Sequence, residues 1–115
     1  DDEIADLEWG VKKLLGLRIF EDADGKMNLP IGEKMGILVV SQFTLHANLK
    51  KGFRPSFKRA APPSLAVSLY HRFIEVLENS FAGVVQTGKF GAHMKIELLE
   101  DGPVTIWLDS KDKNY

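Results

Sequence analysis

The sequence predicts a single domain of the α/β (α+β) class over residues 1–115, with two main helices packed on a compact, barrel-like sheet that is mixed or antiparallel. Apolar residues recur at helical spacing in two segments, one at the start of the chain and one in its middle. Short runs of β-branched and other apolar residues, bounded by glycine and proline, follow these segments and are typical of strands. At 115 residues and 44% hydrophobic side chains, the chain fits one domain large enough to bury a core.

The first expected helix covers residues 2–15, and Gly16 ends it. Its apolar face consists of Ile4, Leu7, Val11 and Leu14. A short strand at residues 17–20 comes next, followed by an Asp-Gly turn within residues 21–26 and an extended segment at 27–30. This order predicts a hairpin or a tight loop.

The most strand-like run in the chain is residues 37–45. It begins with four consecutive apolar residues, which is the pattern of a strand covered on both faces. Polar side chains then appear at Ser41, Gln42 and Thr44, on both faces near the C-terminal end of the expected strand. Ligand-facing groups are common at such a position. Polar side chains bonded to neighbouring backbone give the same pattern, so both interpretations stay open.

Basic residues are concentrated in the middle of the chain, although the net charge is only -1. Residues 34–74 contain seven bases and no acid, between flanks that are both acidic. The bases are Lys34, Lys50, Lys51, Arg54, Lys58, Arg59 and Arg72. Such a block favours a surface that meets phosphate, with chance clustering as the alternative. Within it, the loop at 46–59 interleaves bases with Phe53 and Phe57, which either stack on nucleic-acid bases or anchor the loop.

The second expected helix starts at residues 62–64 and ends between Asn79 and Gly83. Its apolar stripe is Leu65, Leu69, Phe73, Val76 and Leu77, widened by Ala66, Tyr70 and Ile74. A strand at residues 84–87 follows. Two glycines on either side of Phe90 then predict a tight bend where the backbone lies close to another part of the molecule.

The end of the chain predicts a hairpin, because residues 95–99 and 104–108 both alternate between apolar and polar side chains. Gly102-Pro103 lies in the turn between them. The peptide bond before a proline adopts the cis form at a cost of only about 0.5 to 1 kcal/mol, so a rigid cis turn is accessible here. Ordinary turn formation by Gly-Pro is the alternative.

Several kinds of site have no counterpart in the sequence. The chain has no cysteine, and its three histidines are scattered without a carboxylate cluster, which predicts no metal site. It has no glycine-rich phosphate or dinucleotide motif, which predicts no cofactor. On a continuous strand Ser41 and His46 would point to opposite faces, which argues against a serine hydrolase. No apolar run approaches the roughly 18 residues of a membrane span, so a soluble protein without a membrane partner is expected.

Several motifs together resemble the D-aminoacyl-tRNA deacylase family. Ser41-Gln42-Phe43-Thr44-Leu45 and Gly102-Pro103-Val104-Thr105 occur in the order found in that family and about 60 residues apart. Further matching blocks are Leu17-Arg18-Ile19-Phe20, Gly25-Lys26-Met27-Asn28, Arg54-Pro55-Ser56-Phe57, Ala61-Pro62-Pro63 and Gly88-Lys89-Phe90-Gly91-Ala92. Each block is weak alone, but the co-linear set is specific and covers essentially the whole chain.

The resemblance implies a cytoplasmic homodimer that hydrolyses the ester between a D-amino acid and the 3′ end of tRNA. Backbone groups of residues 41–44 would polarise the ester carbonyl, and a hydroxyl of the terminal adenosine would assist the attacking water. Thr44 has also been considered as a nucleophile in this family, but no base lies beside it in the sequence, which favours the backbone role. A cis Gly102-Pro103 turn would enter the partner subunit's pocket and exclude L side chains.

The resemblance also implies which residues hold the tRNA. Phe90, Gly91 and Met94 match the region that receives the terminal adenine. The basic block, with Lys50, Lys51 and Arg54, would attract phosphate.

Two departures from the family pattern stand out. Glu100 occupies a position where the family usually has asparagine, so the turn at Gly102 is expected to be capped differently. Family members also begin with a strand pair that has no counterpart here, which predicts an exposed strand edge and a chain that is poorly stable and weakly active alone. Two other functions stay open, namely a nucleic-acid-binding module without catalysis and a deacylase that acts mainly on mischarged glycyl-tRNA.

Overall fold

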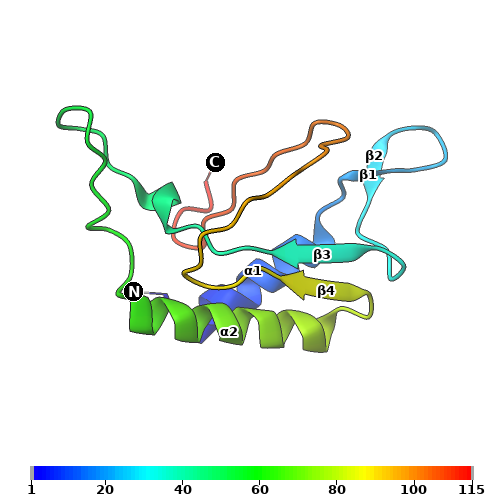
Figure 1. Cartoon of the computed structure of the whole chain (residues 1–115). Coiled ribbons are helices and arrows are strands. Elements are labelled where there is room, and N and C mark those ends of the chain that lie inside the picture. Colours follow the sequence, from blue (N-terminus) through cyan, green and yellow to red (C-terminus); the bar gives the residue numbers. More distant parts are fainter. Residues whose placement is uncertain (1, 115) are drawn as a thin grey trace.

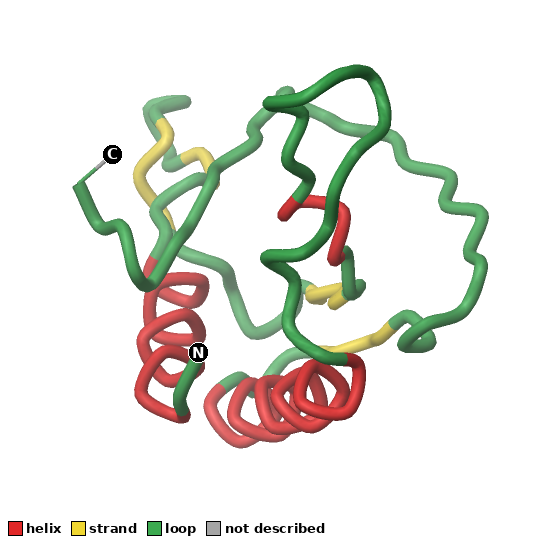
Figure 2. Tube along the Cα trace, turned by 90° about the vertical axis from the view of Figure 1, so that its left-hand side faces the viewer, coloured by secondary structure: helices red, strands yellow, loops and turns green. Residues whose placement is uncertain are grey.

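The computed structural model describes residues 2–114 and combines two helices with two strand pairs, which confirms the predicted α/β class (Figure 1). In chain order the elements are α1 (Ile4–Gly16), β1 (Phe20–Glu21), β2 (Met27–Leu29), β3 (Gly36–Val39), the 3₁₀ turn η1 (Phe43–His46), α2 (Pro63–Ser80) and β4 (Val84–Thr87). Within the described residues the strands form two separate pairs and no closed barrel. Both helices lie on one side of the β3–β4 pair, and long loops lie on the other (Figure 2).

The central strand pair is parallel. β3 and β4 are in register from Gly36 beside Val84 to Val39 beside Thr87. α2 provides the crossover between these strands, as parallel pairing requires. Both strands therefore end at the same edge, and the chain segments that follow them leave the sheet side by side.

The hydrophobic core lies where the two helices meet the inner face of this strand pair. Val11 of α1, Leu77 of α2 and Phe81 are buried, with exposed fractions of 3%, 0% and 9%. Ile37 and Val39 alternate toward this core from β3. Both predicted helices are confirmed, because α1 and α2 bury residues of their predicted apolar stripes, Val11 and Leu77, in the same core.

Two features of the predicted strand at residues 37–45 are wrong. β3 ends at Val39, and the chain then turns into η1 instead of continuing as a strand. The strand is also covered on one face only, since the outward-facing Leu38 is 61% exposed. Its consecutive apolar residues gave no sign of this, because they satisfy the pattern of a two-sided strand whether or not a second layer is present.

The terminal hairpin is present as a bend in the chain but not as paired strands. Residues 95–99 and 104–108 belong to no strand, and no backbone hydrogen bond joins them in the part of the chain that the structure describes. Leu98, Leu99 and Trp107 are 78%, 94% and 53% exposed. Alternation predicts the conformation of a strand but does not supply the neighbour whose hydrogen bonds complete it.

The predicted hairpin near the start of the chain is confirmed. β1 and β2 pair antiparallel, with Phe20 beside Leu29. The carboxylate of Asp22 accepts hydrogen bonds from the backbone N–H groups of Asp24 and Lys26, at 2.9 and 3.0 Å, and so closes the turn. These bonds, led by the one from Lys26, lower the pKa of Asp22.

An ion pair connects the two ends of the described chain. The Lys111 ammonium group donates a hydrogen bond of 2.7 Å to the carboxylate of Asp6 in the first turn of α1. This bond, together with one from the backbone N–H of Glu3, lowers the pKa of Asp6 from 3.8 to about 2. The same pairing raises the pKa of Lys111.

The core contact predicts the effect of one truncation. Replacing Leu77 by Ala should lower the free energy of unfolding by about 2 to 5 kcal/mol, because it leaves a cavity at the only fully buried large side chain among the described residues. Leu65→Ala, in the same helix but 41% exposed, is the matched control. Urea denaturation of both variants measures the difference. Equal losses in the two variants would show that the core has been placed wrongly.

The Asp6–Lys111 pair predicts a pH dependence. Because folding depresses the pKa of Asp6, its contribution to stability is complete above about pH 4 and is lost as the pH falls toward about 2. Asp6→Asn should therefore lower the melting temperature at pH 7 and reduce its fall between pH 4 and pH 2. Asp24→Asn, which removes an equal charge outside any ion pair between described residues, should keep the wild-type profile. An unchanged profile in Asp6→Asn would contradict the assignment.

Candidate functional site

A cleft of about 530 Å³ lies at the edge where β3 and β4 end. Most of its lining comes from the segment after β3, one face of α2 and the segment after β4, and Asp2, Leu7, Ala60, Ala61 and Ile96 complete it. Its walls include Val40, Ser41, Gln42, Phe43 and His46 from the first segment, Ala66, Leu69, Tyr70 and Phe73 from α2, and residues 90–94 from the last. The parallel pairing of the strands therefore brings together residues that are about 50 positions apart in the sequence.

Residues 41–43, which belong to the candidate catalytic segment of the sequence, form one wall of the cleft. Thr44 is not among the lining residues, and its hydroxyl donates a hydrogen bond of 2.5 Å to the side-chain oxygen of Gln42. The amides of Gln42, Phe43 and Thr44 donate no hydrogen bond within the described residues, because they begin the short turn η1. Three backbone donors in succession are thus available to an acceptor in or beside the cleft.

His46 and His93 also line the cleft. The strand-geometry argument that separated Ser41 from His46 was wrong, since η1 replaces the continuous strand on which it relied. No hydrogen bond joins Ser41 to either histidine among the described residues, so the cleft contains no assembled serine–histidine pair. Among the described residues this wall offers the unpaired backbone N–H groups of Gln42 and Phe43, together with the side chains of Ser41, Gln42 and His46.

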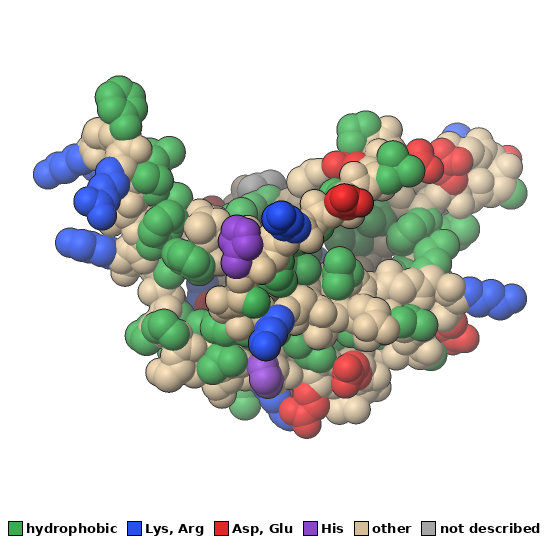
Figure 3. All heavy atoms as spheres, in the orientation of Figure 1, with side chains coloured by type: hydrophobic (Ala, Val, Ile, Leu, Met, Phe, Trp, Pro, Cys, Tyr) green, Lys and Arg blue, Asp and Glu red, His purple; other side chains and the backbone are tan. Residues whose placement is uncertain are grey.

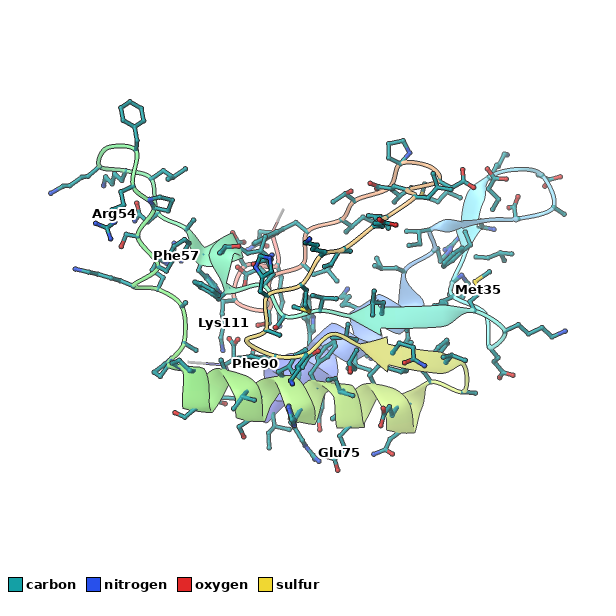
Figure 4. The ribbon with its side chains drawn as sticks, viewed as in Figure 1. Met35, Arg54, Phe57, Glu75, Phe90 and Lys111 are labelled. Atoms are coloured by element: carbon teal, nitrogen blue, oxygen red, sulfur yellow. The ribbon has the colours of Figure 1, made fainter. Side chains whose placement is uncertain are left out.

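The segment after β4 forms the opposite wall and contains the predicted tight bend. Phe90, Gly91 and Met94 all line the cleft. A Cβ atom at Gly88 would lie 2.9 Å from the sulfur of Met94, so a larger residue there would require the Met94 side chain to move. Gly91 has a φ of 73°, in the left-handed region that favours glycine. Gly91 therefore permits the bend in the segment that carries the Phe90 ring to the cleft (Figure 4).

Tyr70 on α2 ties the two walls together. Its hydroxyl lies 3.0 Å from the carbonyl oxygen of Val39, the last residue of β3, and 3.3 Å from that of Gly88, just after β4. The Val39 carbonyl also accepts a hydrogen bond of 2.8 Å from the Gly88 amide. The Tyr70 ring packs against Phe90 with centroids 5.5 Å apart. The sequence placed Tyr70 in an apolar stripe, and no local signal distinguished its hydroxyl from that of a surface tyrosine.

Gly102 and Pro103 lie away from this cleft. Both are exposed, and neither is among its lining residues. Their peptide bond is cis. The turn is closed by the hydroxyl of Thr105, which donates a hydrogen bond of 3.1 Å to the carboxylate of Glu100. Glu100 thus caps the turn through a side-chain contact at the position where the sequence departs from the family pattern.

The predicted phosphate-binding residues Lys50, Lys51 and Arg54 are also outside the cleft. They lie on a loop that projects from its rim, where basic side chains gather around a hydrophobic tip (Figure 3). No group of three or more potential metal-ligating side chains occurs in residues 2–114, and none of the helices there is both long and apolar enough to cross a bilayer.

The Tyr70 contacts predict a local effect of removing one oxygen atom. Tyr70→Phe should cost about 1 kcal/mol of stability and should also speed hydrogen exchange at the Gly88 amide by about 5-fold, because only the backbone bond from Gly88 to Val39 then holds the two strand ends together. Ser80→Ala is the matched control, since it removes a hydroxyl bond of 2.8 Å to a backbone carbonyl elsewhere on α2. Equal exchange at Gly88 in both variants would contradict the role of Tyr70.

Comparisons with known proteins identify the family. The sequence profile of the family described as D-Tyr-tRNA(Tyr) deacylase matches residues 1–109. The chain is 52% identical to a D-aminoacyl-tRNA deacylase of Bacteroides fragilis over 97% of its own length and 75% of the relative. It is 55% identical to the Thermotoga petrophila enzyme of the same name, over 96% of its length and 74% of the relative.

A solved structure agrees with the sequence relatives. The c-Myc DNA Unwinding Element Binding Protein superimposes with a TM-score of 0.83 at 40% identity, over 92% of this chain and 72% of that one. The expected fold and the expected assignment to a hydrolase family are thereby confirmed. The chain belongs to the D-Tyr-tRNA(Tyr) deacylase family.

Proposed function

We propose that the protein hydrolyses the ester between a D-amino acid and the 3′ end of tRNA, in the cytoplasm where aminoacyl-tRNA is used. The relatives named above carry this activity in their names. The observation that carries the proposal is the composition of the cleft. Ser41-Gln42-Phe43 and Phe90-Gly91, which belong to separate motifs of the family resemblance, line the same cleft from opposite walls.

Backbone groups at residues 41–44 are the proposed catalytic groups. Water attacks the ester carbonyl carbon, and the negative charge that develops on the carbonyl oxygen is stabilised by amide N–H groups of this segment. The bond to the ribose oxygen then breaks, this oxygen takes up a proton, and the amino acid leaves with a free carboxylate. The unpaired amides of Gln42, Phe43 and Thr44 support this role. The resemblance adds that a hydroxyl of the terminal adenosine assists the water.

The opposite wall is the proposed site of the terminal adenine. Phe90 offers an aromatic face beside Tyr70, and Met94 offers a polarisable sulfur next to Gly88. Adenine is recognised by stacking in many single-stranded RNA complexes. In this arrangement the base lies against one wall while the ester reaches the amides of the other.

Chiral selectivity is assigned to Gly102-Pro103 of a second subunit. In a single chain this turn is exposed and outside the cleft, so it can exclude an L side chain only from a cleft on another copy. A homodimer with the active site at the interface follows. The apolar surface of the terminal arms supports it, because Leu98, Leu99 and Ile106 are 78%, 94% and 47% exposed in the monomer.

Two other functions compete with this proposal. A nucleic-acid-binding module without catalysis is favoured by one observation, the name of the structural relative, which describes binding to a DNA unwinding element. The other alternative is a deacylase that acts mainly on glycyl-tRNA. A site that excludes L side chains still admits glycine, because glycine has no side chain. Activity on glycyl-tRNA therefore shows whether the protein selects for the D configuration itself or only against an L side chain.

A deacylation assay tests the proposal directly. The protein should release the amino acid from D-aminoacyl-tRNA and leave the L-aminoacyl form intact, because only the L side chain meets the turn of the partner subunit. Glycyl-tRNA is included as the achiral substrate. Release of label from each tRNA is followed over time, with a DNA binding measurement in parallel. Binding of nucleic acid without release from any substrate would favour the binding module.

The role of Thr44 is tested by Thr44→Val in the same assay. If the backbone amides act, this variant should keep kcat within about 10-fold of the wild type, since the Thr44 hydroxyl bonds to Gln42 and to no other described residue. Loss of a covalent nucleophile would instead lower kcat by about 10⁴-fold or more. Ser41→Ala is the matched control for loss of a hydroxyl at the cleft itself. A loss on the larger scale in Thr44→Val alone would overturn the backbone mechanism.

A further inference from the structure

The two phenylalanines of the basic loop have different environments. Phe57 is half-buried and packs edge-on against Phe43, with ring centroids 5.1 Å apart. It therefore anchors the loop to the cleft wall. Phe53 is fully exposed, at 103% of its reference area. An isolated ring held in water has no structural role in the monomer, so Phe53 is the residue of the pair that is available to a partner.

The segment that carries Phe53 is a defined hairpin, here called the basic hairpin (residues 48–56). Asn48 and Ser56 pair through two backbone hydrogen bonds of 2.8 and 3.0 Å. The Asn48 side chain also accepts a bond of 2.8 Å from the Lys50 amide. These contacts hold the tip away from the body of the molecule, as Figures 1 and 4 show for the loop that carries Arg54.

The charge around Phe53 is entirely positive. Lys50, Lys51 and Arg54 flank it in the hairpin, and Lys58 and Arg59 follow. None of these five bases forms an ion pair with a carboxylate among the described residues, whose salt bridges join Arg72 to Glu75 and Lys111 to Asp6. Unpaired cations around an exposed aromatic ring match a polyanion that also offers flat, apolar faces. Single-stranded nucleic acid has both features.

The basic hairpin extends directly from the cleft. His46 and Ala60, which flank it in the sequence, both line the cleft. The chain from Asn48 to Phe53 makes five residue-to-residue steps and spans at most about 17 Å. Phe53 therefore lies within the length of a few nucleotides from a 3′ terminal nucleotide held in the cleft.

We propose that Phe53 stacks on an unpaired base of the same RNA whose 3′ end occupies the cleft, a few nucleotides before that end. Lys50, Lys51 and Arg54 bind the flanking phosphates. This inference rests on the proposed function, because it takes the cleft as the site of the 3′ terminus. It assigns to Phe53 a contact with the nucleic acid that is separate from the ester and from the terminal adenine.

Binding of uncharged tRNA tests the contact without relying on catalysis. Fluorescence anisotropy is measured with full-length tRNA and with the same tRNA trimmed of its unpaired 3′ nucleotides. Phe53→Ala should weaken binding of the full-length tRNA by about 5- to 150-fold, and Phe53→Trp should restore it, because stacking needs a ring. The trimmed tRNA should show no difference between these variants. Leu49→Ala, which removes a 62% exposed apolar side chain from the same hairpin, should bind as the wild type does.

Four outcomes would overturn the inference. Two concern tRNA affinity, namely wild-type affinity in Phe53→Ala and a loss of affinity in Leu49→Ala equal to that in Phe53→Ala. The other two concern the partner, namely Phe53-dependent binding to anionic phospholipid vesicles in place of tRNA, and Phe53-dependent self-association in place of tRNA binding. The deacylation assay keeps the two proposals distinct. Release of D-amino acids together with unaltered binding by Phe53→Ala overturns the stacking contact alone. Phe53-dependent binding without release supports the contact and overturns the proposed hydrolysis.

Discussion

The parallel pairing of β3 and β4 is the constraint on which the candidate site depends. Because the strands run in the same direction, residues 41–43 and 90–94 leave the sheet at one edge and face each other across the cleft. An antiparallel arrangement would place these segments at opposite ends of the sheet. Tyr70 also fixes the positions of the two walls relative to each other, since its hydroxyl contacts the carbonyl groups of Val39 and Gly88, where the walls begin. α2 thus serves both as the crossover and as the floor of the site.

Periodicity in the sequence predicted the parts of the fold whose partners are close or whose apolar stripes are long. Both helices and the β1–β2 hairpin were found in this way, and β4 was found from its short β-branched run although its partner β3 lies far away in the sequence. The end of β3 was missed, because Ser41 to Leu45 can form a strand or a 3₁₀ turn, and the choice depends on tertiary contacts such as the packing of Phe43 on Phe57. The terminal arms were missed for a related reason. Their residues suit a strand, but a strand also needs a neighbouring strand to pair with, and a local sequence pattern does not show whether one is present.

The candidate site was predictable mainly through motifs, and the structure adds to it the contact of the Thr44 hydroxyl and the free amides of η1. Ser41, Gln42 and Phe43 line the cleft with Phe90, Gly91 and Met94, whereas Thr44 points its hydroxyl at Gln42. The free amides of η1 could not be foreseen from a strand, because a strand would have used its N–H groups in pairing. Gly102-Pro103 and the basic hairpin lie outside the cleft, so selectivity and RNA binding are assigned to surfaces that a single cleft does not contain.

The central claim is that two distant segments form one site for the aminoacylated 3′ end. It is tested most directly by titrating the protein with a non-hydrolysable 3′-D-aminoacylamino-adenosine and following backbone amide chemical shifts. The account predicts that amides of residues 41–44 and of residues 90–94 shift together with a single affinity, while Glu75 on the outer face of α2 stays unchanged (Figure 4). Shifts confined to one of the two segments, or centred on the outer face of α2, would contradict it.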